Sequence, residues 1–306
     1  MTGRIRPAYG RMGRVPALAA RLGRRRLIRA GAVAVASAAA TAIYVRYLET
    51  RWLDCSRLRI PIDGLPAVFR GFRIVQLTDI HHSSVVPLPY IESCIDAAND
   101  MKPDLVVLTG DYITTSGKKY TRPVIEALNG LRARLGVCAV LGNHDYGVYR
   151  FRVSKRDPHA AESFAEHFER SGIRLLVNES IRVRLDGASL AVVGLDDLWS
   201  GGFAPEAAFD GIEPQVPRLV LSHNPDSADL LARFRSDLIV SGHTHGGQVV
   251  LPLIGAPLLP VQNRERRAGL YSVGDGLLYV NRGIGHLAPV RFNCRPEISL
   301  FELTPV

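Results

Sequence analysis

Residues 137–145 read VCAVLGNHD, a run of buried-type residues that ends abruptly in polar ones. The same order recurs at 73–81 (RIVQLTDIH), 105–111 (LVVLTGD), 219–225 (LVLSHNP) and 238–245 (LIVSGHTH). Short apolar runs that alternate with helix-like segments are typical of an α/β layered fold. We therefore expect five buried strands here, with covering helices at 87–100, 122–135, 159–172 and 225–234.

Each expected strand ends in Asp, Asn or His, and the functional crevice of an open α/β sheet lies beyond the carboxyl ends of its strands. Two carboxylates, four imidazoles and one amide form a donor set suited to Mn, Fe, Zn or Co. Seven donors exceed what one substrate-binding ion needs, so the set favours two divalent ions that share one carboxylate. The candidate metal ligands are Asp79, His81, Asp111, Asn143, His223, His243 and His245.

Two of these motifs, Asp79-x-His81 and His243-x-His245, place their ligands two residues apart. In extended backbone, residues two apart project to the same side of the chain. The spacing therefore predicts extended backbone that aims both members of each pair into the crevice.

The series DxH, GD, GNHD, H and GHTH, in this order, resembles the calcineurin-like metallophosphoesterase superfamily over about residues 72–303. The resemblance implies a four-layer αββα sandwich of two mixed sheets that hydrolyses phosphoester bonds. Segments 242–248 (GHTHGGQ), 281–285 (NRGIG) and 294–297 (CRPE) are similar to a narrower branch of exported or membrane-attached bacterial phosphodiesterases.

The resemblance also implies a role for each motif. One ion would be held by Asp79, His81 and His245. The other would be held by Asn143, His223 and His243, with Asp111 bridging the two. His144 would lie over the reacting phosphate as charge stabiliser or general acid, and Asp145 would orient the His144 ring.

Other candidates have two interpretations. Arg282 is a candidate phosphate clamp, because arginine pairs bidentately with phosphate oxygens, but it would serve equally well to tie down an irregular loop. His159 and His167 are expected to be structural helix residues. His82 is expected beside the site rather than as a ligand, and His286 is expected outside the pocket.

The charge is concentrated at the amino terminus. Residues 1–29 contain nine of the 38 basic residues and no acidic one, so the remainder carries 29 basic against 29 acidic residues. A neutral body removes the main support for nucleic-acid binding. Four cysteines without a CxxC pair exclude a disulfide scaffold and a cysteine zinc module.

Between Arg29 and Arg46 lie sixteen uncharged residues, Ala30–Val45. As a helix they span roughly 24 Å, slightly less than the ~30 Å hydrocarbon core. With the preceding GRRRLIR at 23–29, the segment is either a twin-arginine-like export signal or an uncleaved membrane anchor. The basic flank predicts that the body lies outside the cytoplasm, either exported or on the bacterial inner membrane. We expect three regions: the signal or anchor (1–46), a linker (47–71) and the metallophosphoesterase domain (72–306).

Residues 249–260 (VVLPLIGAPLLP), which we call the lip, follow the last metal motif. The lip is either a hydrophobic surface for lipid chains or a buried loop that covers the site, and we favour the buried loop. The expected activity is hydrolysis of a phosphodiester of the membrane or envelope, a substrate class that includes lipid-linked esters. The alternatives are a phosphomonoesterase and a non-catalytic metal-bound scaffold, although the complete ligand set argues against a scaffold.

Overall fold

The computed structural model describes residues 15–115, 118–149, 157 and 159–306. The chain divides into two units, one up to Tyr44 and one from Val45 to Val306. Four of the nine amino-terminal arginines precede residue 15 and so lie outside the described residues, and the side chains of residues 15–25 are not described either.

The first unit contains helix α1 (Val15–Ile43), and a π-helical turn (Tyr44–Leu48) continues it into the second unit. The stretch Arg26–Arg51 is long and apolar enough to cross a membrane, with a mean hydropathy of 1.6, and its side chains up to Ile43 are exposed. A membrane anchor and a signal sequence both fit this finding.

The second unit contains two six-stranded mixed sheets. In the first, the strand order is β1-β12-β2-β3-β4-β5, with β2 to β5 parallel and β12 antiparallel to β2. The strands of this sheet are β1 (Asp54–Ile62), β2 (Arg73–Leu77), β3 (Leu105–Thr109), β4 (Val137–Val140), β5 (Ile173–Leu175) and β12 (Glu297–Pro305).

The second sheet has the order β10-β11-β9-β8-β7-β6, with a parallel centre and an antiparallel strand at each edge. Its edge pair β6–β7 turns at Asp186 and Gly187, both in the left-handed conformation that a tight hairpin requires. The strands are β6 (Glu179–Leu185), β7 (Ala188–Gly194), β8 (Arg218–Leu221), β9 (Leu238–Ser241), β10 (Gly269–Val273) and β11 (Gly276–Val280).

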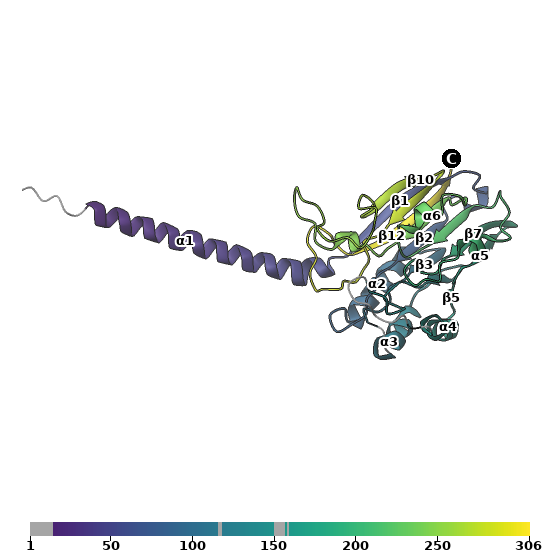
Figure 1. Cartoon of the computed structure of the whole chain (residues 1–306), viewed down its shortest axis with the longest axis horizontal. Coiled ribbons are helices and arrows are strands. Elements are labelled where there is room, and N and C mark those ends of the chain that lie inside the picture. Colours follow the sequence, from purple (N-terminus) through teal and green to yellow (C-terminus); the bar gives the residue numbers. More distant parts are fainter. Residues whose placement is uncertain (1–14, 116–117, 150–156, 158) are drawn as a thin grey trace, which may run out of the picture. The chain divides into compact units, whose positions relative to one another are not determined.

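Helices cover the outer faces of both sheets (Figure 1). The central strands are buried on both faces, so Val107 packs between the sheets while Val106 packs against the helices. This arrangement confirms the expected αββα sandwich. The helices are α2 (Leu88–Asp100), α3 (Lys118–Leu128) and α4 (Ala160–Arg170) on the first sheet, and α5 (Pro205–Phe209) and α6 (Ser227–Leu230) on the second.

Residues 47–71 differ from the expected linker. They include β1, which pairs with β12 along its whole length, and the fully buried Phe69. Glu49 is buried too, and its Oε1 accepts the backbone N–H of Cys294 at 2.6 Å. Strand β1 was missed because it is an edge strand whose exposed residues alternate with partly or fully buried ones, so it lacks a continuous apolar run.

Candidate metal centre

The five strand ends singled out in the sequence meet at one place. β2, β3 and β4 are neighbours in the first sheet, and β8 and β9 are neighbours in the second. Each of the seven candidate ligands follows one of these strands, and none is more than 5% exposed. Buried polar groups at this density need partners to offset their desolvation.

One cluster joins Asp79, His81 and His245, whose ligand atoms all lie within 4.8 Å of one another. The Nε2 atoms of His81 and His245 are 3.0 Å apart. The Nε2 atom of His245 lies 3.4 Å from Oδ1 of Asp79. Two imidazole nitrogens and a carboxylate that converge on one point resemble the ligand geometry of a transition-metal ion.

A second cluster joins Asp111, His223 and His243. The Nε2 atom of His223 lies 3.2 Å from Oδ2 of Asp111 and 3.2 Å from Nδ1 of His243. The same Oδ2 of Asp111 is 3.4 Å from Nε2 of His81 in the first cluster. Asp111 therefore stands between the two clusters.

Five of the seven ligand positions have left-handed backbone, which costs a non-glycine residue on the order of 1 kcal/mol or more. The pairs predicted to be extended are not extended. Left-handed turns after the strands aim these side chains inward, where extended backbone would carry the chain past the crevice. The φ angles are 49° at Asp79, 51° at His81, 56° at Asp111, 69° at His243 and 49° at His245.

Two glycines allow the carboxylates to approach the backbone. A Cβ on Gly142 would lie 2.2 Å from Oδ1 of Asp111, and one on Gly242 would lie 2.1 Å from Oδ2 of Asp79. The backbone N–H of His243 donates to both oxygens of Asp79 at 3.0 Å. The glycine before each polar tip therefore makes room for a ligand from another strand.

The protonation pattern of the centre is set by burial and by Asp111. Burial alone would lower the pKa of His223, but the adjacent Asp111 carboxylate outweighs it and raises that pKa to about 10. Burial lowers the pKa of His243 to about 3 and holds the pKa values of His81 and His245 well below their usual range. The lowered pKa values favour neutral, electron-pair-donating imidazoles at His81, His243 and His245, and a divalent cation would compete with the proton that Asp111 favours on His223.

Asn143 supplies an independent test of fit. Its Nδ2 donates to the carbonyl of Val148 at 2.6 Å, while its buried Oδ1 has no hydrogen-bond partner. A buried amide oxygen without a donor is costly unless something else coordinates it. The donor set and this orphaned oxygen fit a divalent metal centre.

His144 lies beside the clusters. Its backbone N–H donates to Oδ1 of Asp111 at 2.9 Å, and its Nδ1 is 2.7 Å from the carbonyl oxygen of Thr114. The ring is edge-to-face with His81, with centroids 4.8 Å apart. Since a carbonyl only accepts, Nδ1 carries hydrogen and Nε2 is left for the site.

Asp145 does not have its expected partner. Its carboxylate accepts the backbone N–H groups of Asp111, Tyr112 and Gly142, each at 2.9 Å. The position that we expected Asp145 to occupy on the His144 ring belongs to the carbonyl of Thr114. Asp145 instead holds the turns after β3 and β4 together, because a buried carboxylate is stabilised best by several N–H donors.

Arg282 follows its structural interpretation. Its Nε donates to Oε2 of Glu297 at 2.8 Å, and its Nη2 donates to Oδ2 of Asp54 at 2.7 Å. These two carboxylates engage the guanidinium and tie the end of β11 to β12 and β1. The phosphate-clamp expectation is corrected accordingly.

The remaining histidines lie outside the two clusters. Nδ1 of His82 is 3.0 Å from the carbonyl oxygen of Val86. On and beside α4, His159 contacts Glu162, and His167 contacts the carbonyl oxygen of Ser163. His286 is buried, with an unpartnered Nδ1.

A sixth polar strand end, after β7, was not among those predicted from the sequence. Oδ2 of Asp197 accepts the N–H groups of Trp199 and Ser200 at 2.8 and 3.0 Å, while its buried Oδ1 has no partner. This turn places the Trp199 ring edge-on to His243, with centroids 4.6 Å apart. Residues 191–197 read AVVGLDD, so the rule that found the other five ends applies here as well.

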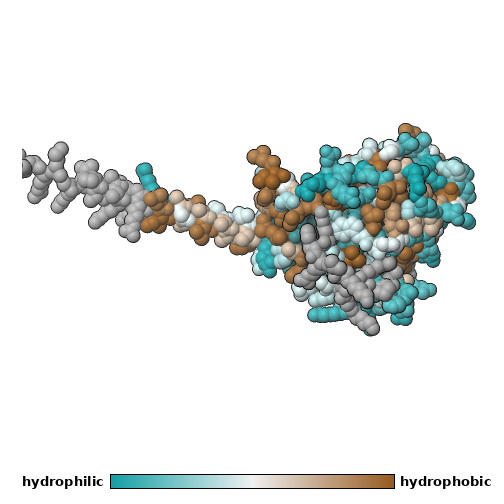
Figure 2. Space-filling model, in the orientation of Figure 1, coloured by the Kyte–Doolittle hydropathy of each residue, from teal (hydrophilic) through white to brown (hydrophobic). Residues whose placement is uncertain are grey.

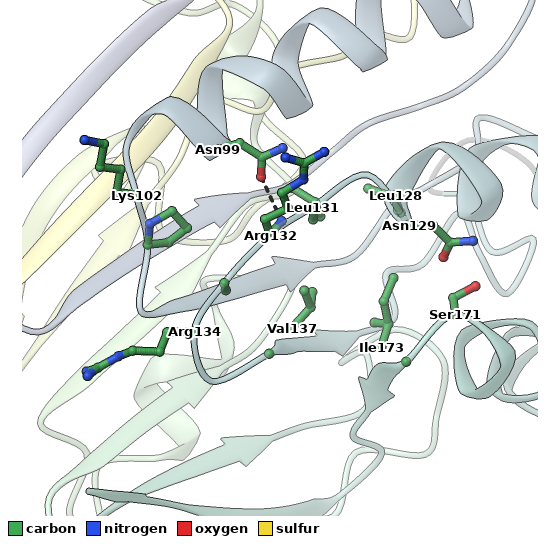
Figure 3. A pocket seen from close by; sticks show the side chains of 14 residues that line it. Asn99, Lys102, Leu128, Asn129, Leu131, Arg132, Arg134, Val137, Ser171 and Ile173 are labelled. Carbon is green, nitrogen blue, oxygen red and sulfur yellow. Dashed lines mark hydrogen bonds between the residues drawn. The ribbon is translucent and has the colours of Figure 1, made fainter.

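A surface hollow lies at the opposite edge of the first sheet, where β3, β4 and β5 begin (Figure 3). Lys102, Arg132, Arg134 and Ser171 are among its lining residues, and Asn99 accepts the backbone N–H of Arg132 at 2.8 Å. None of the seven candidate ligands lines this hollow. This hollow and the candidate metal ligands therefore lie at opposite ends of the strands of the first sheet.

The sequence matches the family described as calcineurin-like phosphoesterase over residues 72–247. It is 34% identical to phosphodiesterase YaeI of Escherichia coli over 92% of this chain and 99% of that protein. It is 34% identical to the uncharacterized metallophosphoesterase YkuE of Bacillus subtilis, over 92% and 98% of the two chains. It is 31% identical to the UDP-2,3-diacylglucosamine pyrophosphatase LpxG of Chlamydia muridarum, over 88% and 94%. The chain thus belongs to the calcineurin-like phosphoesterase family and is a metal-dependent phosphoester hydrolase.

Proposed function

We propose that this protein is a two-metal phosphodiesterase that acts on a membrane- or envelope-associated substrate. The observation that carries the proposal is the position of Asp111, whose Oδ2 lies 3.4 Å from Nε2 of His81 and 3.2 Å from Nε2 of His223. A single carboxylate oxygen within reach of both clusters suits a bridge between two ions. Asp79, His81 and His245 would hold one ion, and Asn143, His223 and His243 the other.

Two divalent ions at such a centre, when bound, neutralise phosphate charge and activate water near neutral pH. The rest of the chemistry falls to His144. Its Nδ1 is fixed by the carbonyl of Thr114 at 2.7 Å, so its Nε2 is free to hold a proton for the leaving oxygen. Asp145 would act indirectly, by holding the turns after β3 and β4 that carry Asp111 and His144.

The preference for a diester is supported by YaeI, a relative over nearly its whole length that is named a phosphodiesterase. LpxG, named for its action on a diacylglucosamine nucleotide, supports a lipid-linked substrate. The apolar stretch Arg26–Arg51 supports membrane attachment. We further propose that the basic flank keeps the amino terminus in the cytoplasm, that export follows the twin-arginine route, and that the domain lies outside the cytoplasm.

The domain boundary is also part of the proposal. The family match covers residues 72–247, but β1 and the buried Glu49 pack with β12 and Cys294. We propose that the catalytic domain begins near Val45 and extends to the end of β12. Any functional test should therefore use the full chain.

The test is to purify the full chain in detergent without chelator, add Mn²⁺, and compare bis-p-nitrophenyl phosphate with p-nitrophenyl phosphate. We expect the diester to be preferred. We expect His144→Ala to lower turnover by about 10²–10⁴-fold while two equivalents of metal remain bound. His159→Ala, on an exposed histidine that contacts Glu162, is the matched control.

Preference for the monoester would replace the diesterase proposal with a phosphomonoesterase. Folded protein with two bound ions and no turnover of either ester would favour a scaffold or a more demanding substrate. A metal content of one ion would contradict the bridging role of Asp111.

A further inference from the structure

The lip, residues 249–260, is exposed at its tip. Leu253 is 108% exposed, Ile254 74% and Leu258 73%, and Figure 2 shows brown apolar surface projecting from the folded domain. The buried-loop expectation holds only for Ala256 and Leu259, which form a small cluster at the base with Val261. Contiguous exposed apolar surface of this kind marks an interaction site.

The exposed tip is held in a defined shape. Leu251 and Gly255 exchange both backbone hydrogen bonds, at 2.9 and 2.8 Å, which closes a tight turn. Within this turn Leu253 has a φ of 66°, a conformation that branched apolar residues rarely adopt. The guanidinium of Arg264 donates to the carbonyl of Ala256 at 2.9 Å. The chain thus accepts backbone strain and fixes the loop while it displays leucines to solvent.

The base of the lip adjoins the point where the membrane candidate enters the domain. The N–H of Arg291 donates to the carbonyl of Val45 at 2.9 Å, and the next residue, Phe292, accepts the N–H of Val250 at 2.8 Å. Leu253 follows Val250 by three residues, a reach of at most about 10 Å. Since Arg26–Arg51 includes Val45, an anchored chain keeps the lip close to the bilayer.

The surroundings of this point match a membrane interface. Tyr47 and Trp52, at the end of the candidate span, are 56% and 54% exposed, and aromatic residues of this kind concentrate at headgroup depth. Arg46 and Arg51 beside them are exposed cations, suited to anionic headgroups. The lip tip itself is aliphatic, whereas protein-binding hot spots are enriched in Trp, Tyr and Arg. The chemistry therefore favours a lipid surface over a protein partner.

The carboxyl end of the lip reaches the metal centre. The carbonyl oxygen of Pro260 is 3.1 Å from Nε2 of the candidate ligand His243. The segment that displays the leucines is thus continuous with a wall of the centre. Insertion of the tip would bring the headgroup layer close to the candidate metal centre.

We propose that residues Pro252–Leu258 insert into the bilayer interface, and that the centre takes its phosphodiester from a lipid that stays in the bilayer. Insertion of the lip is supported by the exposure of its tip, by the geometry of its turn and by the contact between Arg291 and Val45. The second half rests on the proposed phosphodiesterase function.

The first half is tested by spin labels on the full chain in vesicles of phosphatidylcholine and phosphatidylglycerol. A label is placed at Leu253→Cys in a Cys55→Ser background, because Cys55 is an exposed native thiol and the three other cysteines are buried. Val306→Cys, 88% exposed, is the control at the far end of β12, about 30 Å from its start at Glu297. We expect oxygen to relax the Leu253 label more than a water-soluble nickel chelate does, and the reverse at Val306.

Equal nickel accessibility at Leu253 and Val306 would overturn insertion, as would failure of the protein to float with the vesicles. Protection of Leu253 that persists without lipid would point to a second copy or a protein partner and would also overturn it. Because this readout needs no turnover, it is independent of the phosphodiesterase proposal.

The second half is tested with Leu253→Ser/Leu258→Ser on two diesters, a water-soluble chromogenic one and a fluorescent-headgroup phospholipid in vesicles. We expect turnover of the vesicle substrate to fall about tenfold and turnover of the soluble substrate to stay unchanged. Equal loss on both would overturn delivery by the lip and indicate damage to the centre. If the parent protein cleaves neither diester, the phosphodiesterase proposal fails while the spin-label result still stands.

Discussion

The metal centre and the lip depart from the usual burial pattern in opposite directions. At the centre, seven polar side chains are at most 5% exposed. On the lip, less than ten residues after His245 along the chain, Leu253 and Ile254 are at least 74% exposed. Each departure costs free energy, and each is held by dedicated backbone geometry. Buried polar groups point to chemistry inside the fold, whereas exposed apolar groups point to a partner outside it.

Replacing Asp111 with Asn tests the centre most directly. The change keeps the size of the side chain but removes the charge between His81 and His223. We expect kcat/KM to fall on the order of 10³-fold or more, together with loss of bound metal measured by elemental analysis. Asp186→Asn, on the exposed β6–β7 turn, should leave both unchanged. Full activity of Asp111→Asn would show that the buried polar cluster is not the catalytic centre.

Glu297 is a buried charged residue near the metal centre, and its role is structural. Its carboxylate is 3% exposed and paired with Arg282 at 2.8 Å. Glu297→Gln leaves the guanidinium with only Asp54, so we expect a loss of about 3 kcal/mol at pH 7, measured by denaturant unfolding.

The direction of the Glu297 pKa shift determines how this ion pair changes stability with pH. Burial alone would raise the pKa of Glu297, but Arg282 outweighs burial and holds the pKa below 4.5. The ion pair therefore stabilises the fold above the unfolded-state pKa, and the stabilisation is lost as the pH falls through the folded-state pKa. The difference in the free energy of unfolding between the parent protein and Glu297→Gln should become smaller below about pH 4.5. A gap that stays constant down to pH 3 would show that packing, and not charge, produces it.

Gly142→Ala separates metal binding from folding. The added Cβ would lie 2.2 Å from Oδ1 of Asp111 and displace the carboxylate that lies between the clusters. We expect metal affinity to weaken by about 10–100-fold, measured by competition with a chromophoric chelator. Affinity that matches the parent protein would mean that the turn after β4 relaxes without moving Asp111.

The smallest effect is expected within the lip, where two adjacent leucines differ in burial. Leu259 is 5% exposed and Leu258 is 73% exposed. In detergent solution, Leu259→Ala should destabilise the domain by about 2 kcal/mol, whereas Leu258→Ala should change stability by less than about 0.5 kcal/mol. Thermal unfolding of the two variants compares them directly. Equal losses would show that the lip is an ordinary covering loop.

The central strands could be predicted because their burial leaves a local pattern in the sequence. The strands β2, β3, β4, β8 and β9 are buried on both faces, so each appears as a short, mainly apolar run without alternation. Edge strands such as β1 and β10 alternate and carry no such signal. The missed turn at Asp197 belongs to the first class, since AVVGLDD has the form of the other strand ends.

The sequence by itself determined which strands end in candidate metal ligands and in what order, because residue type and local periodicity carry that information. Only the tertiary structure decided the partner of each polar group. The ring of His144 faces a carbonyl 30 residues away, and Arg282 reaches a carboxylate 228 residues away. The exposure of the lip was also decided only by the tertiary structure. The sequence of an apolar run is the same whether a neighbouring segment buries it or leaves it exposed.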